Sequence, residues 1–424
     1  MPKYRGHILA ALAMLLVVGV LYGRIAWGMI SHQSDTKAYV QMAVEWNRTG
    51  IRPKSHFLFP LLTVATYHSG LVSSFPAAEM VVLLACYWST ALLLYGLLYW
   101  AFRDHAWLGR PWVLALCALA ILVAQPLDFR NEYEIGFFWP TQFDNPPSAL
   151  AKPFSVTAFL CAAWSLANRR RLDPALCAIS AAATVAGALS KPSFLICLAP
   201  AAGAIALVRL LWRKDISITG LALCMLIPAV LVLGWQFSQT FAAKAVSSEY
   251  HDTIIWAPMA VMRHYSSDLI MKCLLSVAFP LAATLLHWNR ARTDTAMLLA
   301  WASFFIGAFY AYTLAERTSL LAGNFLWSPY AATFILIFAA VLFWLRELAR
   351  SGPRGWRSWR HAVLASLLLL HAGCGLMGIQ SYWRIVREAD RLHTMVTYPC
   401  APSARRALSA RPPLNGCACY INRS

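Results

Sequence analysis

Long apolar stretches separated by short charged loops run through the whole chain, and they constrain its fold more than any other feature. The first covers residues 7–30, and about 20 helical residues are enough to cross the hydrocarbon core of a bilayer. The chain of 424 residues is 59% hydrophobic and only 13% charged, unlike a soluble domain. We therefore predict an all-α polytopic membrane protein with about 11 transmembrane helices. The expected spans are residues 7–30, 77–102, 111–127, 153–167, 174–189, 193–211, 216–237, 269–288, 296–314, 326–345 and 362–382.

The loops between these stretches differ in charge, and the difference predicts an orientation. With the N-terminus in the cytoplasm, every cytoplasmic loop is basic, as the positive-inside rule requires. These loops account for the net charge of +18, so we expect no nucleic-acid partner. The abundance of Arg and Ala is typical of a bacterial protein, and we expect a multi-pass protein of the bacterial inner membrane. The expected external loops hold most of the acids: Asp35, Asp128, Glu132, Glu134, Asp144, Glu249, Asp252 and Glu316.

Residues 57–72 are also apolar, but they do not fit this alternation as a span. If they crossed the membrane, every later basic loop would lie outside. We therefore expect a re-entrant or interface-lying segment, because backbone at that depth is tolerated where protein or a water-filled cavity covers it. This segment belongs to a first external loop, residues 31–76, and a second external loop is expected at residues 128–152. The predicted transmembrane bundle comprises residues 1–382, and residues 383–424 form an external tail.

The stretch from residue 31 to residue 50 follows the first span and carries an acid, Asp35, at the membrane edge. A carboxylate at this depth can act as a base towards a substrate whose head group lies at the interface. Asp35 can equally cap the next helix, because Ser and Asp are favoured at that position. Position alone leaves both interpretations open.

This stretch resembles the first external loop of the GT-C membrane glycosyltransferases, which take a sugar from a polyprenyl-phosphate carrier. In the aminoarabinose and protein mannosyl transferases of that superfamily, two adjacent acids precede an aromatic residue and an amphipathic helix. Here Asp35 matches the first acid and Tyr39 the aromatic residue, while Thr36 replaces the second acid. The resemblance implies a GT-C-like bundle and a base at Asp35. It implies no certain cofactor, because only one acid would be available to bind a divalent metal. The matching residues are Asp35, Tyr39, Ala43, Thr49 and Gly50.

The second expected external loop combines acids, amides and cations with aromatic residues. Aromatic rings can stack on a sugar, while acids and amides bind its hydroxyl groups. The alternative is an interfacial aromatic belt with solvated charges. The candidate sugar contacts in this loop are Asp128, Arg130, Glu132, Asp144 and Asn145.

A phosphate leaving group needs cations near the membrane surface. Lys152 would lie at the external mouth of a span, and Lys191 in a short external turn between two spans. The alternative for Lys191 is snorkelling to the interface, and for Arg317 it is pairing with Glu316. The expected substrate contacts outside the second loop are Tyr39, His56, Lys152, Lys191, Arg263 and Arg317.

Together these features predict a hexosyl- or pentosyltransferase whose site faces the periplasm. It would move a sugar from a polyprenyl-phosphate carrier to a cell-envelope glycan, lipid or protein acceptor, with Asp35 as general base. Two other classes stay open. A transporter or flippase of lipid-linked sugars would carry ionisable residues in mid-span, and a glycan polymerase or ligase would use an external pair such as Arg263 and His264. The sequence contains no phosphate-binding glycine loop or nucleophile elbow, which argues against cytosolic nucleotide chemistry.

Overall fold

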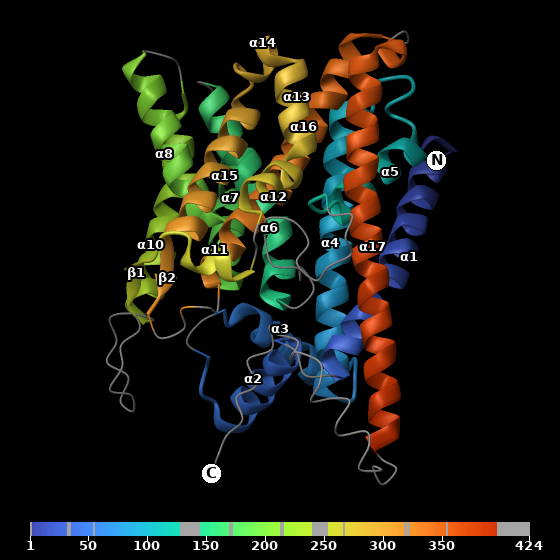
Figure 1. The fold of residues 1–424 in the computed structure, drawn as a ribbon, viewed down its shortest axis with the longest axis vertical. Coiled ribbons are helices and arrows are strands. Elements are labelled where there is room, and N and C mark those ends of the chain that lie inside the picture. The colour runs from blue at the N-terminus through green and yellow to red at the C-terminus, as the bar shows by residue number, and fades with distance from the viewer. Residues whose placement is uncertain are drawn as a thin grey trace.

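The computed structural model describes residues 2–31, 35–53, 56–127, 145–168, 173–212, 216–239, 253–265, 268–317, 320, 323–352 and 355–396. These residues form a bundle of helices with one small two-stranded sheet at its lower end (Figure 1). The elements are α1 (Pro2–Ser31), α2 (Asp35–Thr49), α3 (Leu58–His68), α4 (Phe75–Phe102), α5 (Pro111–Val123), α6 (Pro146–Ala167), α7 (Pro174–Ser190), α8 (Leu195–Leu211), α9 (Ile218–Leu221), the π-helical turn η1 (Ala222–Leu226), α10 (Ile227–Phe237), β1 (Ile254–Trp256), α11 (Ala260–Tyr265), α12 (Leu269–Ser276), α13 (Ala278–Leu286), α14 (Trp288–Ala291), α15 (Thr295–Thr313), β2 (Leu314–Glu316), the 3-10 turn η3 (Asn324–Leu326), α16 (Trp327–Arg350), the 3-10 turn η4 (Gly355–Arg357) and α17 (Trp359–Val396).

Within the described residues, seven helical segments are long and apolar enough to cross a membrane. They contain α1, α4, α6, α9 to α10, α15, α16 and α17. The pair α12 and α13 adds an eighth if it is one broken span, bent by 66°. The chain is thus an all-α polytopic membrane protein. The count of about 11 stays a prediction, because α5, α7 and α8 are apolar helices of only 13, 17 and 17 residues.

Helix α6 begins at Pro146, earlier than the expected start of its span at residue 153. Asn145 caps the helix, because its Oδ1 accepts a hydrogen bond from the Ser148 backbone N–H at 3.2 Å. Proline is favoured in the first turn, where a missing N–H costs nothing. Residues 146–152, expected in the second external loop, thus form the first turns of α6, and Lys152 lies inside a helix.

The segment predicted as the first external loop contains two helices, α2 and α3, at the lower end of the bundle (Figure 1). α3 has 11 residues, and at 1.5 Å per residue it is too short to cross a bilayer. It contacts both α2 and α4, so it lies against protein on two sides. Its placement relative to the membrane surface stays a prediction.

The last helix, α17, packs against the first helix and against α5 at close range. A Cβ atom added at Gly28 would lie 2.3 Å from a methyl group of Val386, and one added at Gly375 would lie 1.7 Å from the carbonyl oxygen of Val123. Small residues allow this close approach between membrane helices. α17 continues without interruption from residue 359 to residue 396, past the expected end of the bundle at residue 382.

A buried histidine of α17 supplies hydrogen bonds where two neighbouring helices are interrupted. Gln125, just after α5, donates its backbone N–H to the His371 carbonyl at 3.0 Å. The backbone N–H of Phe279, just after the break between α12 and α13, donates to His371 Nε2 at 3.3 Å. Because Nε2 accepts, Nδ1 carries the proton and donates to the Gln125 carbonyl at 2.5 Å. These hydrogen bonds satisfy backbone N–H and C=O groups for which lipid offers no hydrogen-bond partner.

Candidate functional site

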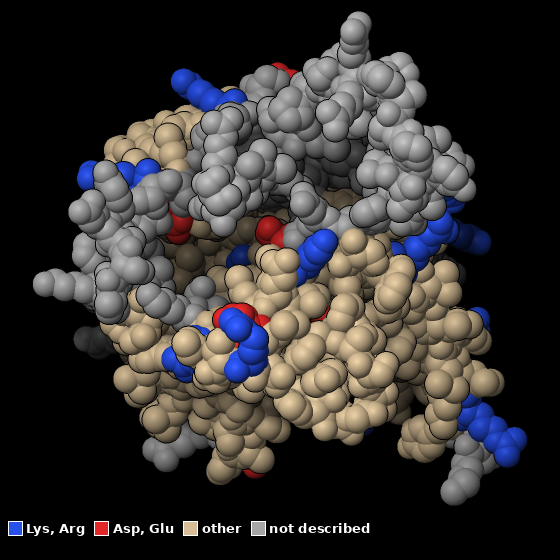
Figure 2. Space-filling view, turned by 90° about the horizontal axis from the view of Figure 1, so that it is seen from below, with Lys and Arg blue, Asp and Glu red and all other residues tan. Residues whose placement is uncertain are grey.

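Several of the predicted site residues gather at the lower end of the bundle. α2 and α3 contact α4 and α6, and α3 also contacts α7, so the first external loop covers the ends of these helices. Figure 2, viewed from this end, shows a hollow with acidic and basic side chains inside it.

Two buried lysines line one cavity at this end. The lining of this cavity includes Lys152, Lys191, Ser148, Ser155 and Ser193, together with alanine and aromatic side chains. Lys152 is 7% exposed and Lys191 is 8% exposed. Ammonium and hydroxyl groups are hydrogen-bond donors, so this lining suits an anionic oxygen-rich ligand.

Both lysines lie over aromatic rings of α16. The Lys191 Nζ is 4.5 Å from the centre of the Trp327 ring, and the Lys152 Nζ is 5.1 Å from the centre of the Phe334 ring. An ammonium over a ring face gains electrostatic stabilisation that offsets part of its desolvation. Phe334 also lines the cavity, so part of the cavity wall is apolar.

Asp35 is the first residue of α2, and its side chain is exposed. Partial desolvation by the surrounding protein raises its pKa, and the positive charge of Lys191 opposes that rise. The next residue, Thr36, stands where the resembled family has a second acid. It is fully buried, and its hydroxyl contacts the Met29 sulfur at 4.0 Å. Asp35 therefore supplies a single carboxylate here, because the next residue in the chain is not an acid.

Lys191 lies at the end of α7, within electrostatic reach of two acids. Burial lowers its pKa to about 7, while the charges of Asp35 and Glu316 act in the opposite direction. At neutral pH both forms of Lys191 are therefore populated. A bound anion would favour the charged form, so ligand binding and protonation of Lys191 are coupled.

Tyr39 lies one helical turn after Asp35, as predicted, and is 8% exposed. Its ring packs edge-on against Phe59, with the ring centres 6.0 Å apart. Burial raises the pKa of Tyr39, and the charges of Asp35 and then Glu79 raise it further. Tyr39 is thus within electrostatic reach of the exposed acid of α2 and of a buried acid of α4.

Glu79, which the sequence places near the end of a span, is not among the predicted site residues. It is fully buried in the first turns of α4, and neither carboxyl oxygen has a hydrogen-bond partner among the described residues. A carboxyl group inside a span is costly and usually functional. That cost is the signal that could have identified Glu79 from its position inside an apolar run.

His56 lies beside the end of α7, in a strained backbone conformation. Its φ is +53°, which is unfavourable for a residue with a Cβ atom. Burial and then the charge of Lys191 lower its pKa to about 3, although a hydrogen bond to the Ser190 backbone acts in the opposite direction. The imidazole is therefore neutral at physiological pH.

The remaining predicted substrate contacts in the described part of the chain are not among the residues that line the lysine cavity. Asn145 is 5% exposed, and its Oδ1 accepts from both the backbone and the hydroxyl of Ser148, so it serves as a helix cap. Arg263 of α11 and Arg317, which follows β2, are exposed and are not among the described residues that line the lysine cavity. The residues that lie outside the described part of the chain are Asp128, Arg130, Glu132 and Asp144. The side chain of His264 also lies outside it.

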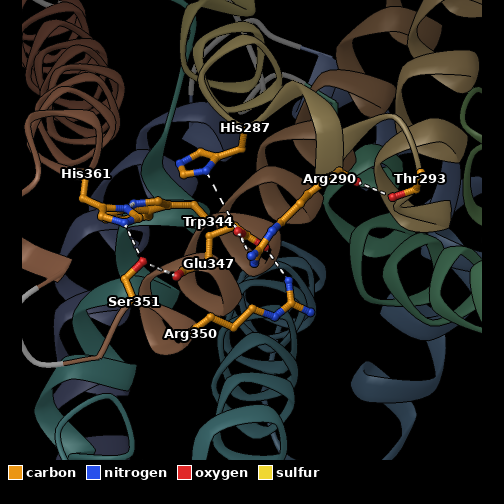
Figure 3. Close-up of polar contacts among 8 residues, drawn as sticks. All are labelled: His287, Arg290, Thr293, Trp344, Glu347, Arg350, Ser351 and His361. Atoms are coloured by element: carbon orange, nitrogen blue, oxygen red, sulfur yellow. Dashed lines mark hydrogen bonds and ion pairs between the residues drawn. The ribbon is translucent and has the colours of Figure 1, made fainter.

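A second polar cluster, drawn in Figure 3, includes Arg290 of α14, which lies at the end of the bundle opposite α2 and α3 (Figure 1). Its centre is Glu347 of α16, which is 4% exposed. Arg290 donates to one carboxylate oxygen at 2.8 Å, and Arg350 pairs with the other oxygen. His287 stacks on His361 of α17, with ring centres 5.4 Å apart. This cluster ties α14, α16 and α17 together far from the lysine cavity.

Within the described residues, no group of three His, Cys, Asp or Glu side chains could hold a metal ion. No family model, no curated protein and no solved structure matches this chain. The described residues thus form a polytopic all-α membrane protein with a cavity at one end of the bundle, and two buried lysines belong to the lining of that cavity.

Proposed function

We propose that this protein is a membrane glycosyltransferase of the GT-C type that uses a polyprenyl-phosphate-linked sugar. The observation that carries the proposal is the cavity lined by Lys152 and Lys191, with Asp35 within electrostatic reach of Lys191. Transfer from a lipid phosphate requires a base for the acceptor and cations for the leaving group. These residues supply both near one end of the bundle.

In the proposed reaction, the Asp35 carboxylate takes the proton from an acceptor hydroxyl or amine. The acceptor oxygen or nitrogen forms a bond to the anomeric carbon, and the bond from that carbon to the phosphate oxygen breaks. The leaving polyprenyl phosphate keeps the electron pair. Its added charge is stabilised by Lys191 and Lys152, and a single in-line attack inverts the anomeric carbon.

The buried environment of Lys191 suits this role. With a pKa of about 7, Lys191 gains a proton readily when a phosphate enters the cavity. Its charge then acts in a site with little water, where electrostatic stabilisation is stronger than in bulk solvent. The apolar side of Phe334 would lie towards the lipid chain.

A transporter of lipid-linked sugars is the second candidate, and one observation favours it. Glu79 and Lys152 are both buried inside long helices, where ionisable residues often mark a substrate path. A transporter would carry the intact lipid across the bilayer and leave the glycosidic bond in place.

One experiment separates the two candidates. The purified protein is placed in liposomes with a panel of radiolabelled polyprenyl-phosphate hexoses and pentoses, together with an extract of cell-envelope acceptors. The transferase account predicts bare polyprenyl phosphate and labelled acceptor as products. Movement of intact lipid-linked sugar between leaflets, without cleavage, would instead establish the transporter.

A further inference from the structure

Two side chains from different elements reach the last turn of α7. The final carbonyl groups of a helix have no partner within the helix. The Gln236 Nε2 of α10 donates to the Ala188 carbonyl at 2.8 Å. His56, from the connection before α3, makes its hydrogen bond to the Ser190 backbone. Both side chains thus cap α7 immediately before Lys191.

Capping uses only one polar atom of each side chain. The other atoms, Gln236 Oε1 and His56 Nδ1, are buried and have no hydrogen-bond partner among the described residues. Gln236 is 8% exposed as a whole. Buried polar atoms are nearly always paired, so two orphans at one helix end need an explanation beyond the cap.

The two orphan atoms can both bind a hydroxyl group. Because the Gln236 NH₂ group donates to Ala188, the amide oxygen Oε1 is the free acceptor. His56 Nδ1 accepts a hydrogen bond in one tautomer of the neutral ring and donates one in the other. A hydroxyl group can donate or accept, so two hydroxyl groups would satisfy both atoms.

The residues next to His56 and Gln236 in the chain are in contact with each other. Phe57 follows His56 and Trp235 precedes Gln236, and the two rings meet edge-on with centres 6.2 Å apart. The Arg52 guanidinium lies 4.5 Å from the Phe57 ring centre and 5.0 Å from that of Trp235. Aromatic rings beside amide and imidazole groups are the surroundings that a sugar ring favours.

We propose that His56 and Gln236 form a hydroxyl-binding subsite for a sugar, next to the phosphate pocket of Lys191. The proposal rests on the function proposed above and names the part of that site that binds the sugar. One sugar hydroxyl group donates to Gln236 Oε1 and another makes a hydrogen bond with His56 Nδ1, while Lys191 contacts the adjoining phosphate. The sugar belongs either to the lipid carrier or to the acceptor glycan.

Binding measurements test this subsite without requiring turnover. The purified protein in detergent is titrated with a polyprenyl-phosphate hexose, with bare polyprenyl phosphate and with a soluble methyl hexoside. The parent protein should bind the sugar-bearing lipid more tightly than the bare lipid. Gln236→Leu and His56→Gln should each reduce that preference roughly threefold to tenfold, the effect of one hydrogen bond. His56→Gln keeps an N–H donor for Ser190, so its loss of affinity would not come from a lost cap.

The three ligands also identify the source of the sugar. If the variants lose the preference for the lipid-linked hexose over the bare lipid, the subsite binds the donor sugar. If Gln236→Leu loses affinity for the methyl hexoside, the subsite binds the acceptor sugar. Gln380→Leu, at an exposed position of α17, is the matched control and should change no affinity. The subsite is wrong if Gln236→Leu and His56→Gln match the parent in two measurements. These are the preference for the sugar-bearing lipid over the bare lipid and the affinity for the methyl hexoside. Tight binding without any glycosyl transfer would overturn the transferase function but leave the subsite intact.

Discussion

The ammonium of Lys191, at the end of α7, lies 4.5 Å from the centre of the Trp327 ring at the start of α16. This contact joins two helix ends at the cavity, and it holds a cation where little water reaches it. The charge of Lys191 therefore depends on its neighbours, Asp35 and Glu316, and on whatever anion enters the cavity. The first prediction follows from that dependence.

Replacing Lys191 by Met should stabilise the protein at low pH while weakening donor binding. The unfolded chain has the ordinary lysine pKa of 10.5 and the folded protein has a pKa of about 7. Between these values the unfolded state binds more protons, so the stability of the parent rises with pH. Lys191→Met has no buried amino group and so avoids this loss of stability at low pH. Its unfolding midpoint in detergent should exceed that of the parent at pH 6, and the difference should shrink towards pH 10.

Arg292→Met, at an exposed position at the other end of the bundle, should show no such pH-dependent difference. A lower midpoint for Lys191→Met at pH 6 would mean that attraction to Asp35 and Glu316 outweighs the cost of burial. Donor affinity gives an independent check, because the parent should lose affinity as the pH rises above 7 and Lys191 loses its proton.

Glu79 should behave as a residue that lowers stability. A buried carboxyl group without a hydrogen-bond partner costs free energy in either protonation state. Glu79→Leu should therefore raise the unfolding midpoint, while turnover falls if the carboxyl is needed beside Tyr39. Glu45→Gln, on the exposed face of α2, serves as the surface control. A large drop in the midpoint of Glu79→Leu would show that Glu79 has a stabilising partner.

Glu347 should show the opposite behaviour, although it is as deeply buried. Its two oxygens pair with Arg290 and Arg350, and both arginine side chains are more than half exposed. Glu347→Gln removes the charge on which both pairs depend and should lower the free energy of unfolding by about 2 kcal/mol. Thermal unfolding at low and high salt measures this. An unchanged midpoint would show that the cluster in Figure 3 contributes nothing.

Gly375 and Gly373 offer a matched pair in one helix. A Cβ atom at Gly375 would lie 1.7 Å from the Val123 carbonyl oxygen, whereas one at Gly373 has no heavy atom within 4 Å. Gly375→Ala should force α17 away from α5 at a cost of about 3 kcal/mol. Gly373→Ala should be neutral or stabilise by up to about 1 kcal/mol, because alanine favours the helix. Equal unfolding midpoints for the two variants would contradict the packing of α17.

Much of the fold is predictable because spanning helices need long apolar runs and lipid satisfies no backbone groups. The short α3, the turn at Lys191 and the position of Tyr39 one turn after Asp35 all follow from sequence spacing. The start of α6 does not, because Lys152 interrupts the apolar run and conceals the capping signal of Asn145 and Pro146. Glu79, His56 and Gln236 are harder still. Hydropathy gives their depth, but only packing shows which of their polar atoms lack a partner.

The central claim is that Asp35 is the general base. The decisive measurement is the turnover of purified Asp35→Asn with donor and acceptor both saturating. Asparagine keeps the shape of the side chain but cannot take a proton, so turnover should fall by roughly 10²- to 10⁴-fold. Donor binding and the unfolding midpoint should stay close to those of the parent, since the side chain is exposed and such changes seldom cost much stability. Turnover within a few-fold of the parent would contradict the account and remove Asp35 as the base.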